Sequence, residues 1–147
     1  MNNQNSPSAA VALASELRGF AGKLKRRLRE QADVGDLTHS QISVLLRLES
    51  EGASTTSALA RAEGMKSQSM GAVIAALEAM GFVTGAPDPT DRRQTLLSLS
   101  DACRRWIAEG RALRQDWLSR MIDAKLSPQE QEQLSAVLPL LHRIVSD

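Results

Sequence analysis

The sequence predicts one mainly α-helical domain that carries a small antiparallel β-hairpin. Its 147 residues, 42% of them hydrophobic, are enough for a single compact core. Through most of the chain, apolar residues recur at spacings of three and four, which is the pattern of one buried helix face. Between residues 82 and 99 this pattern gives way to the alternation of strands around a turn-rich stretch.

The N-terminal segment is expected to hold one amphipathic helix. Residues 1–8 are polar and are expected to form a flexible arm, so the helix should lie within residues 9–35. One face is apolar and carries Leu13, Leu17, Phe20, Leu24 and Leu28. The other face is rich in lysine and arginine, which gives residues 1–35 a net charge of +3, with six basic and three acidic side chains.

Three shorter helices are expected next. Thr38 and Gln41 form a capping box, which predicts a helix that runs to about Glu49. The second should cover residues 56–63 and the third residues 66–80, and a glycine that favours a helix end follows each of them. The third has a buried face made of Met70, Val73, Ile74 and Leu77.

A hairpin and two longer helices complete the chain. Strands are expected at 82–84 and 94–99, and the residues between them should form the charged tip of the hairpin. Ser100 can cap a helix that runs from Asp101 to about Asp123. A second capping box, Ser127 to Glu130, begins the last helix.

The apolar stripes of the first helix and the last two have no place in the core that the middle segment can close by itself. We therefore expect residues 9–35 and 101–147 to form dimerisation helices, because long terminal helices with sustained stripes usually associate. The alternative is that these helices pack back on the core of their own chain.

The middle segment, residues 36–100, has the element order of a winged helix-turn-helix, in which the last short helix enters the major groove of DNA. Its sequence resembles the MarR family of transcription regulators. The segments that carry the resemblance are LTHSQISVLLRLE (37–49), SALARAEGMKSQSMGAVIAALEAMGFV (57–83) and DPTDRRQTLLSLSDAC (88–103). The most specific pieces are LEAMGFV, at the end of the recognition helix, and DPTDRR, at the wing tip.

The resemblance implies a cytoplasmic homodimer whose terminal helices intertwine. The two winged modules of such a dimer bind double-stranded DNA at a pseudo-palindromic operator, and the expected role is that of a repressor. It also implies a small aromatic or phenolic effector that binds between the dimerisation helices and the winged module. Arg18 and Trp106 are the candidates for that pocket, and each also has an ordinary interpretation, as a surface cation and as a core ring.

The first turn of the recognition helix supplies the first set of candidate DNA contacts: Lys66, Ser67, Gln68 and Ser69. The Gln68 amide can pair with N6 and N7 of adenine, and Lys66 suits a phosphate or a guanine. The alternative interpretation is a solvated first turn that only caps the helix.

The wing tip supplies the second set. Arg92 and Arg93 suit the negative potential of a minor groove, and the family pattern places the groove-entering arginine at Arg93. In that pattern Asp91 orients the wing through an ion pair, while the alternative is a solvated tip. Phosphate contact and helix capping are both open for three polar residues at helix starts: His39, Ser40 and Thr56.

Charge argues for modest DNA affinity. Residues 36–100 carry five basic and seven acidic side chains, a net charge of −2, whereas phosphate neutralisation supplies most non-specific affinity. We therefore expect a shallow salt dependence. The outward face of the recognition helix is almost bare, since it consists of glycine and alanine, so a protein-interaction module with weak or no DNA binding is a rival interpretation.

A thiol redox sensor at Cys103 is a further alternative. It would need a lowered thiol pKa, which Arg104 and Arg105 could provide, while a buried small hydrophobic residue is the other interpretation.

Other classes of protein find no support in the sequence. The two histidines lie far apart without a nucleophile or metal-ligand spacing, so we expect no catalytic residues, no metal and no cofactor. A single cysteine fits a reducing cytoplasm, and no apolar run is long enough to cross a membrane.

Overall fold

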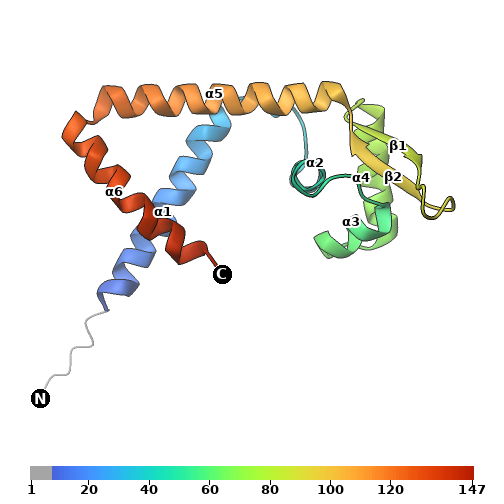
Figure 1. Ribbon diagram of the computed structural model, residues 1–147, viewed down its shortest axis with the longest axis horizontal. Coiled ribbons are helices and arrows are strands. Elements are labelled where there is room, and N and C mark those ends of the chain that lie inside the picture. The colour runs from blue at the N-terminus through green and yellow to red at the C-terminus, as the bar shows by residue number, and fades with distance from the viewer. Residues whose placement is uncertain (1–7) are drawn as a thin grey trace, which may run out of the picture. The chain divides into compact units, whose positions relative to one another are not determined.

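A computed structural model describes residues 8–147 of the chain and contains six helices and one two-stranded sheet (Figure 1). The elements are α1 (Ala9–Glu30), α2 (His39–Glu51), α3 (Thr56–Glu63), α4 (Ser67–Ala79), β1 (Val83–Pro87), β2 (Thr95–Leu99), α5 (Asp101–Lys125) and α6 (Pro128–Val145). The predicted fold class and element order are confirmed. Within the described range, no helix is long and apolar enough to cross a bilayer.

Two compact units divide the chain. One is Val34–Gly110, and we call it the winged module; the other, the helical unit, joins the N-terminal residues through Asp33 to Arg111–Asp147. The first turns of α5 therefore belong to the winged module and the remainder to the helical unit. The predicted arm lies outside the described residues except for Ser8, whose hydroxyl instead caps α1 by accepting a hydrogen bond from the Val11 amide.

Helix ends follow the capping residues that the sequence indicates. Thr38 and Ser127 both form complete capping boxes, with Gln41 and Glu130 as their partners. The Ser100 hydroxyl accepts from the Cys103 amide at 3.1 Å and so caps α5, as predicted. In each case a side-chain oxygen satisfies an amide that has no partner within its helix.

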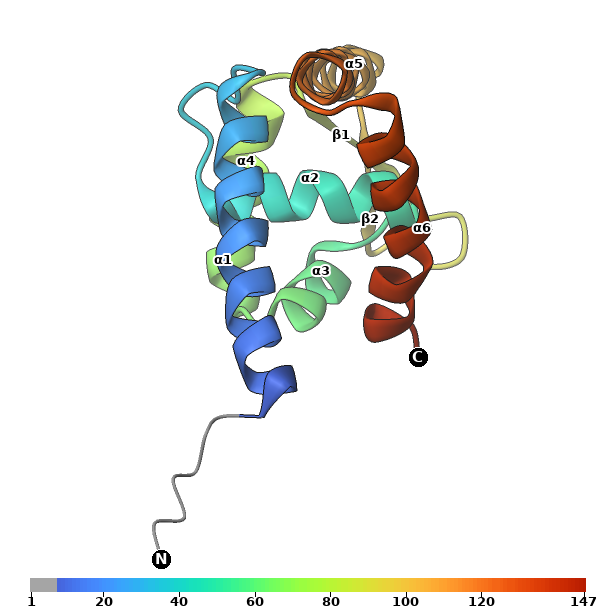
Figure 2. The same ribbon diagram turned by 90° about the vertical axis from the view of Figure 1, so that its left-hand side faces the viewer.

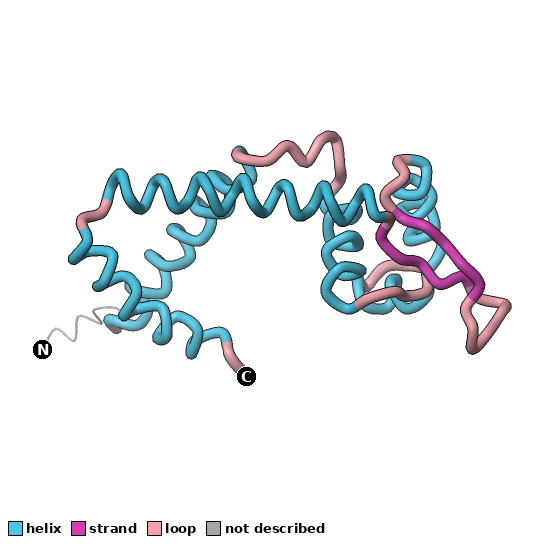
Figure 3. Tube along the Cα trace, turned by 45° about the horizontal axis from the view of Figure 1, so that its top comes forward, coloured by secondary structure: helices cyan, strands magenta, loops and turns pink. Residues whose placement is uncertain are grey.

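The hairpin departs from the prediction at its first strand. β1 extends to Pro87, which pairs with Thr95, so residues 85–87 are strand rather than tip (Figure 3). Glycine is required here for space and not for a turn, because a Cβ on Gly85 would lie 2.7 Å from Thr95 Cγ2. On β2, Leu97 and Leu99 are buried, whereas Thr95, two residues before Leu97, is exposed.

The hydrophobic core lies in the winged module. It takes residues from α2, α3, α4, both strands and the start of α5, and its members are Val44, Leu45, Leu48, Leu59, Ala60, Met70, Ile74, Leu77, Val83, Leu97, Leu99, Cys103 and Ile107. Three of the four predicted buried residues of α4 belong to it, and Val73 is half-buried at its edge. The module thus closes a core without any residue of α1 or α6.

The helical unit is different, because neither α1 nor α6 contains a buried residue. The two helices stand apart from each other in Figure 2. Nine of their large apolar side chains are 41–79% exposed: Val11, Leu13, Phe20, Leu134, Val137, Leu138, Leu140, Ile144 and Val145. Leu17, Leu24, Leu28 and Leu141 are half-buried, so a large part of each apolar stripe, but not all of it, lies in water.

A charged network fixes α2 against α3. Arg47 Nε donates to Glu63 Oε1 at 2.9 Å, and Ser43 Oγ donates to both carboxylate oxygens of Glu63 at 2.9 Å. Arg47 also binds Glu51 at 2.9 Å. The Glu63 side chain is only 16% exposed, and the hydrogen bond from Arg47 lowers its pKa, followed by the bond from Ser43. This network sets how the first two helices of the module lie against each other.

Glu63→Gln removes the charge with little change in shape. Because the folded-state pKa of Glu63 is lowered, its contribution to stability is present above the ordinary glutamate pKa of about 4.3 and is lost as the pH falls below it. We expect the variant to lose about 1–2 kcal/mol in urea unfolding at neutral pH, and the difference from wild type to vanish in acid. Glu51→Gln, whose side chain is 61% exposed, is the control and should lose little. An unchanged stability for Glu63→Gln would contradict this account.

Candidate DNA-binding surface

The turn between α3 and α4 is fixed by backbone hydrogen bonds. Gly64 adopts the left-handed conformation, with φ 64°, and its amide donates to the carbonyls of Ala60 and Arg61. The Met65 amide donates to the Ala60 carbonyl at 2.8 Å, and its side chain packs on the core. These bonds form a helix C-terminal motif that sets the direction in which α4 begins.

The beginning of α4 exposes the predicted first-turn residues. Helix α4 starts at Ser67, so Lys66 is its N-cap rather than a residue of its first turn, which corrects the prediction. Lysine has no acceptor with which to cap a helix, and no side chain caps this end. Ser67, Gln68 and Ser69 are all exposed. The amides of the first turn and the positive end of the helix dipole are therefore available to an anion such as a phosphate.

The rest of the outward face of α4 is built from small residues. Ala72, Ala75 and Ala79 are exposed, and Gly71 and Ala76 are half-buried. Such a surface has no long side chains to read bases, so any recognition by this helix depends on its first turn. It does let the helix backbone approach a groove closely.

Two aspartates order the wing tip. Asp88 Oδ1 accepts hydrogen bonds from the Thr90 amide at 2.9 Å and from its hydroxyl at 2.8 Å, and these bonds lower the pKa of Asp88. Asp91 Oδ1 accepts from the Arg93 amide at 3.1 Å, and the Gln94 amide donates to the Asp91 carbonyl. The tip is thereby held in one conformation by its own side chains.

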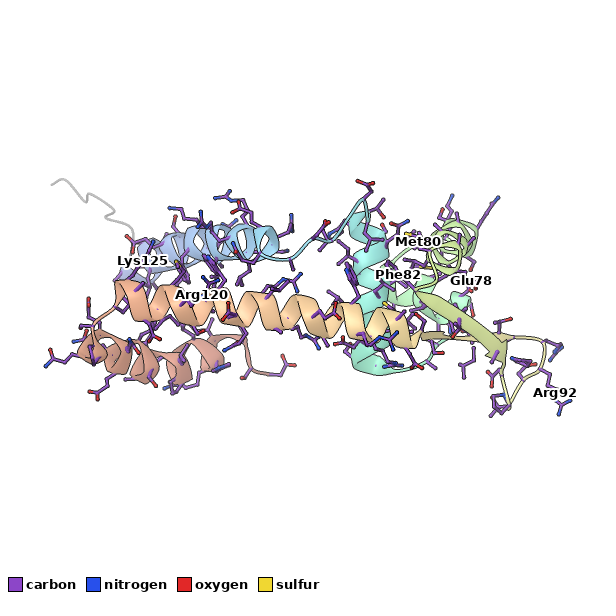
Figure 4. The ribbon with its side chains drawn as sticks, turned by 90° about the horizontal axis from the view of Figure 1, so that it is seen from above. Glu78, Met80, Phe82, Arg92, Arg120 and Lys125 are labelled. Atoms are coloured by element: carbon purple, nitrogen blue, oxygen red, sulfur yellow. The ribbon has the colours of Figure 1, made fainter. Side chains whose placement is uncertain are left out.

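The two arginines of the tip differ in their partners. Arg93 Nε lies 3.3 Å from Asp91 Oδ1 in an ion pair, although the Arg93 side chain is 92% exposed. Arg92 points outward from the far end of the hairpin (Figure 4), and within the described residues no hydrogen bond or ion pair holds it. Arg92 is thus the cation at the tip with no local acidic partner.

The residues at the starts of α2 and α3 do not cap these helices. Thr38 and Thr55 are the N-caps, so capping is excluded as the role of the three residues that follow them in the helices. Of these three, His39 is exposed, and Ser40 and Thr56 are half-buried.

Neither residue of the predicted effector pocket is among those that line the cavity described below. Trp106 stacks on Phe82, with ring centroids 5.3 Å apart and an interplanar angle of 15°, and both rings pack on the core of the winged module. Arg18 is an exposed residue of α1 in the helical unit. The spacing of Phe82 and Trp106 in the sequence gave no signal that they would stack.

The helical unit contains an open cavity of about 430 Å³ that the sequence did not indicate. Its lining is Leu28 of α1 together with five residues of α5: Arg111, Ala112, Arg114, Gln115 and Leu118. Next to it, the Arg27 guanidinium lies 5.5 Å from the centroid of the Trp117 ring. The lining combines apolar side chains with two guanidinium groups and contains no acidic residue.

Cys103 is fully buried, with 0% of its surface exposed. Burial raises the pKa of its thiol; the positive charge of Arg104 opposes the rise, but burial outweighs it. Of the two interpretations of Cys103, the structure supports the buried small hydrophobic residue. A thiol that is buried and kept protonated reacts slowly with oxidants, so the sensor interpretation loses its basis.

Among the described residues, no cluster of histidine, cysteine and carboxylate side chains could hold a metal ion. The exposed candidates at the start of α4, Ser67, Gln68 and Ser69, and at the wing tip, Arg92 and Arg93, belong to one module.

Comparison with known proteins agrees with this geometry. The model of the MarR family matches residues 37–95. An uncharacterized HTH-type transcriptional regulator of Mycobacterium bovis is 38% identical over 135 residues, which are 92% of this chain and 94% of that protein. A similar regulator of Mycobacterium leprae is 42% identical over 106 residues, or 72% of this chain and 74% of that protein. These relatives are named as transcriptional regulators and not as enzymes.

Solved structures show the same fold. A putative transcriptional regulator from Pseudomonas aeruginosa has a TM-score of 0.82 and 35% identity, and the match covers 97% of this chain and 99% of that one. A MepR mutant from S. aureus, bound to an oligodeoxyribonucleotide, has a TM-score of 0.70 and 18% identity over 91% of this chain and 98% of that one.

Proposed function

This chain belongs to the MarR family of transcription regulators, and we propose that it is a cytoplasmic repressor that binds a pseudo-palindromic operator as a homodimer and is released by a small anionic effector. The observation that carries the DNA-binding part is the pairing of an exposed, uncapped α4 start with an ordered wing tip that presents Arg92. The MepR mutant with the same fold was solved with an oligodeoxyribonucleotide, which supports DNA as the partner.

In this proposal α4 lies in the major groove, where Gln68 reads a base and Lys66, Ser67 and Ser69 contact base edges or phosphates. The wing lies over the adjacent minor groove, with Arg92 and Arg93 as its cations and Asp91 as the group that orients Arg93. His39, Ser40 and Thr56 are the remaining candidates for phosphate contacts. A dimer seated on a promoter represses by excluding the polymerase.

Few cations are available for phosphate. Of the five basic residues of the segment 36–100, Arg47 is bound by Glu63 and Glu51, and Arg93 is paired with Asp91. Arg61 lies on α3, so Lys66 and Arg92 carry most of the electrostatic attraction at the start of α4 and at the wing tip. Because each neutralised phosphate adds to the salt dependence of binding, few contacts mean a shallow slope. Specificity must then come from Gln68 and from close approach of the small-residue face of α4.

Gln68→Ala and Arg92→Gln should weaken DNA binding in different ways. With a duplex selected from random DNA, Gln68→Ala should cost about 1–3 kcal/mol and relax the preference at one base pair of each half-site. Arg92→Gln should weaken all sequences about equally and reduce the salt slope by about 1 per bound chain. Fluorescence anisotropy at several salt concentrations measures both effects, with Arg143→Gln on α6 as the control.

A selection that enriches no sequence would contradict the DNA-binding proposal. The small-residue face of α4 would then favour the alternative, a surface that docks on a protein. A steep salt slope for the wild type would contradict the scarcity of phosphate contacts.

The exposed stripes of α1 and α6 support the homodimer. Nine large apolar side chains on these helices are at least 41% exposed, and the winged module has closed its own core without them. At about 25 cal/mol per Å² of apolar surface, covering both stripes provides a large driving force for association. A second copy supplies matching stripes of the same length.

The dimer can be tested by placing a charge on the stripe. Leu138 of α6 is 46% exposed and Leu46 of α2 is 49% exposed, so they form a matched pair. In analytical ultracentrifugation we expect a two-chain mass for wild type and Leu46→Asp and a one-chain mass for Leu138→Asp, because a carboxylate cannot be buried unpaired in an apolar interface. A wild-type protein that sediments as a single chain would refute the dimer.

The cavity of the helical unit supports an effector with an acidic group and an apolar body. Its volume of about 430 Å³ lies within the range of small-molecule sites. The guanidinium group of Arg114 suits a carboxylate, and Leu28 and Leu118 suit a ring. A small aromatic or phenolic acid meets both requirements.

Hydroxybenzoate is a suitable probe for this site. We expect it to raise the Tm of the wild type and to weaken its binding to the selected duplex, and we expect Arg114→Gln to abolish both effects. Arg120→Gln is the control, because Arg120 lies on the same helix but binds Asp116 at 3.0 Å. Equal responses of wild type and Arg114→Gln would exclude the cavity as the effector site.

A further inference from the structure

The end of α4, the base of the wing and the start of α5 meet at one serine. Helix α4 closes with Gly81 in the left-handed region, at φ 76°, and the Phe82 amide donates back to the Leu77 carbonyl at 3.0 Å. The chain then enters β1, returns along β2 and reaches Ser100. Ser100 is therefore the first residue after the wing, and it lies beside Gly81 and Phe82, the two residues that precede the wing.

Ser100 makes three hydrogen bonds that join these elements. Its hydroxyl donates to the Gly81 carbonyl at 2.6 Å and accepts from the Cys103 amide at 3.1 Å. Its amide donates to the Phe82 carbonyl at 3.0 Å. The first bond holds the end of α4, the second caps α5, and the third closes the base of the hairpin.

Packing around Ser100 reinforces the junction. Val83 pairs with Leu99 at the base of the sheet, and both are buried. The Phe82 ring stacks on Trp106 one turn and a half into α5. Beyond the base, the two strands pair through five positions as far as Pro87 and Thr95, so the wing extends from this junction as one unit.

Geometry makes the wing tip sensitive to this junction. Five strand residues at about 3.3 Å each place the tip about 17 Å from the base. A rotation of about 10° at the base would move Arg92 by about 3 Å, which is as long as a hydrogen bond.

We propose that Ser100 is a positioning residue that sets the angle of the wing relative to α4, so that Arg92 reaches the minor groove while α4 occupies the major groove. The proposal rests on the DNA-binding function proposed above. In this proposal the hydrogen bond from the Ser100 hydroxyl to the Gly81 carbonyl sets the wing angle, whereas the bond from the Cys103 amide to the same hydroxyl only caps α5.

Substitution can separate the two roles of the hydroxyl. Aspartate is a good N-cap and still accepts from the Cys103 amide, but an ionised carboxylate has no proton to donate to the Gly81 carbonyl. Ser100→Asp therefore retains the cap and breaks the link to α4. Ser100→Thr keeps both bonds and is the conservative rescue.

Ser98 provides the matched control for the added charge. It lies two residues earlier in β2, and its hydroxyl is 3.4 Å from that of Thr84, a contact within the hairpin alone. Ser98→Asp thus adds the same charge two residues away without removing a hydrogen bond of the junction.

The test is a footprint of the full-length protein on the selected duplex. Hydroxyl-radical cleavage reports the minor groove that flanks each half-site, and dimethyl sulfate reports guanine N7 in the major groove. We expect Ser100→Asp to retain the major-groove protection and lose the flanking minor-groove protection, whereas Ser100→Thr and Ser98→Asp protect both grooves.

A double-mutant cycle gives a second readout of the same proposal. Arg92→Gln should weaken binding about fivefold to tenfold in the wild type and have almost no effect in Ser100→Asp, because the misplaced wing makes no contact to lose. If circular dichroism shows Ser100→Asp to be unfolded, Ser100→Gly takes its place in both experiments, because it removes the hydroxyl and glycine is well tolerated at an N-cap.

The outcomes separate this proposal from the DNA-binding proposal. A wild-type protein that protects no DNA refutes both. If the wild type protects both grooves and Ser100→Asp does the same with the full Arg92 effect, Ser100 is only a cap and the positioning role is refuted.

Discussion

The rest of the structure depends on a core that the winged module closes by itself. Residues from α2, α3, α4 and both strands complete this core with Cys103 and Ile107 from the first turns of α5. Because α1 and α6 contribute nothing to it, their apolar stripes stay exposed. The proposed DNA-binding surface and the proposed association surface are therefore built from separate parts of the chain, and α5 is the helix that both compact units share.

Local pairing of charges decides which residues can act on DNA. A net charge of +1 for the whole chain says little, because the basic residues are distributed unevenly and several are already bound. Arg47 stabilises the angle between α2 and α3 through Glu63, and Arg93 helps order the wing tip through Asp91. On the proposed DNA-binding surface Arg92 and Lys66 are left for phosphate, so in this proposal recognition rests on a few well-placed groups and on how accurately the module presents them.

Much of the fold could be predicted because its signals are local. The capping boxes at Thr38 and Ser127 depend on residues three apart in the chain, and the helical stripes depend on spacings of three and four. The extension of β1 to Pro87 was missed because glycine and proline usually mark turns, whereas here strand pairing and the space above Gly85 decide. The candidate site residues came from a family pattern, and most of them are exposed where a nucleic acid could reach them.

What the sequence could not predict depends on contacts between distant residues. The bond from Ser100 to Gly81 spans 19 positions, and that from Ser43 to Glu63 spans 20. The sequence left two interpretations of Cys103 open for the same reason, since its burial depends on packing that the neighbouring arginines do not reveal.

The central claim is that two chains, each reading one half-site, form the functional unit. Native mass spectrometry of the full-length protein with duplexes that carry one or two copies of the selected half-site tests it directly. The account predicts two chains on the duplex with both half-sites and a much weaker complex on the duplex with one. A single chain bound with equal affinity to both duplexes would contradict it.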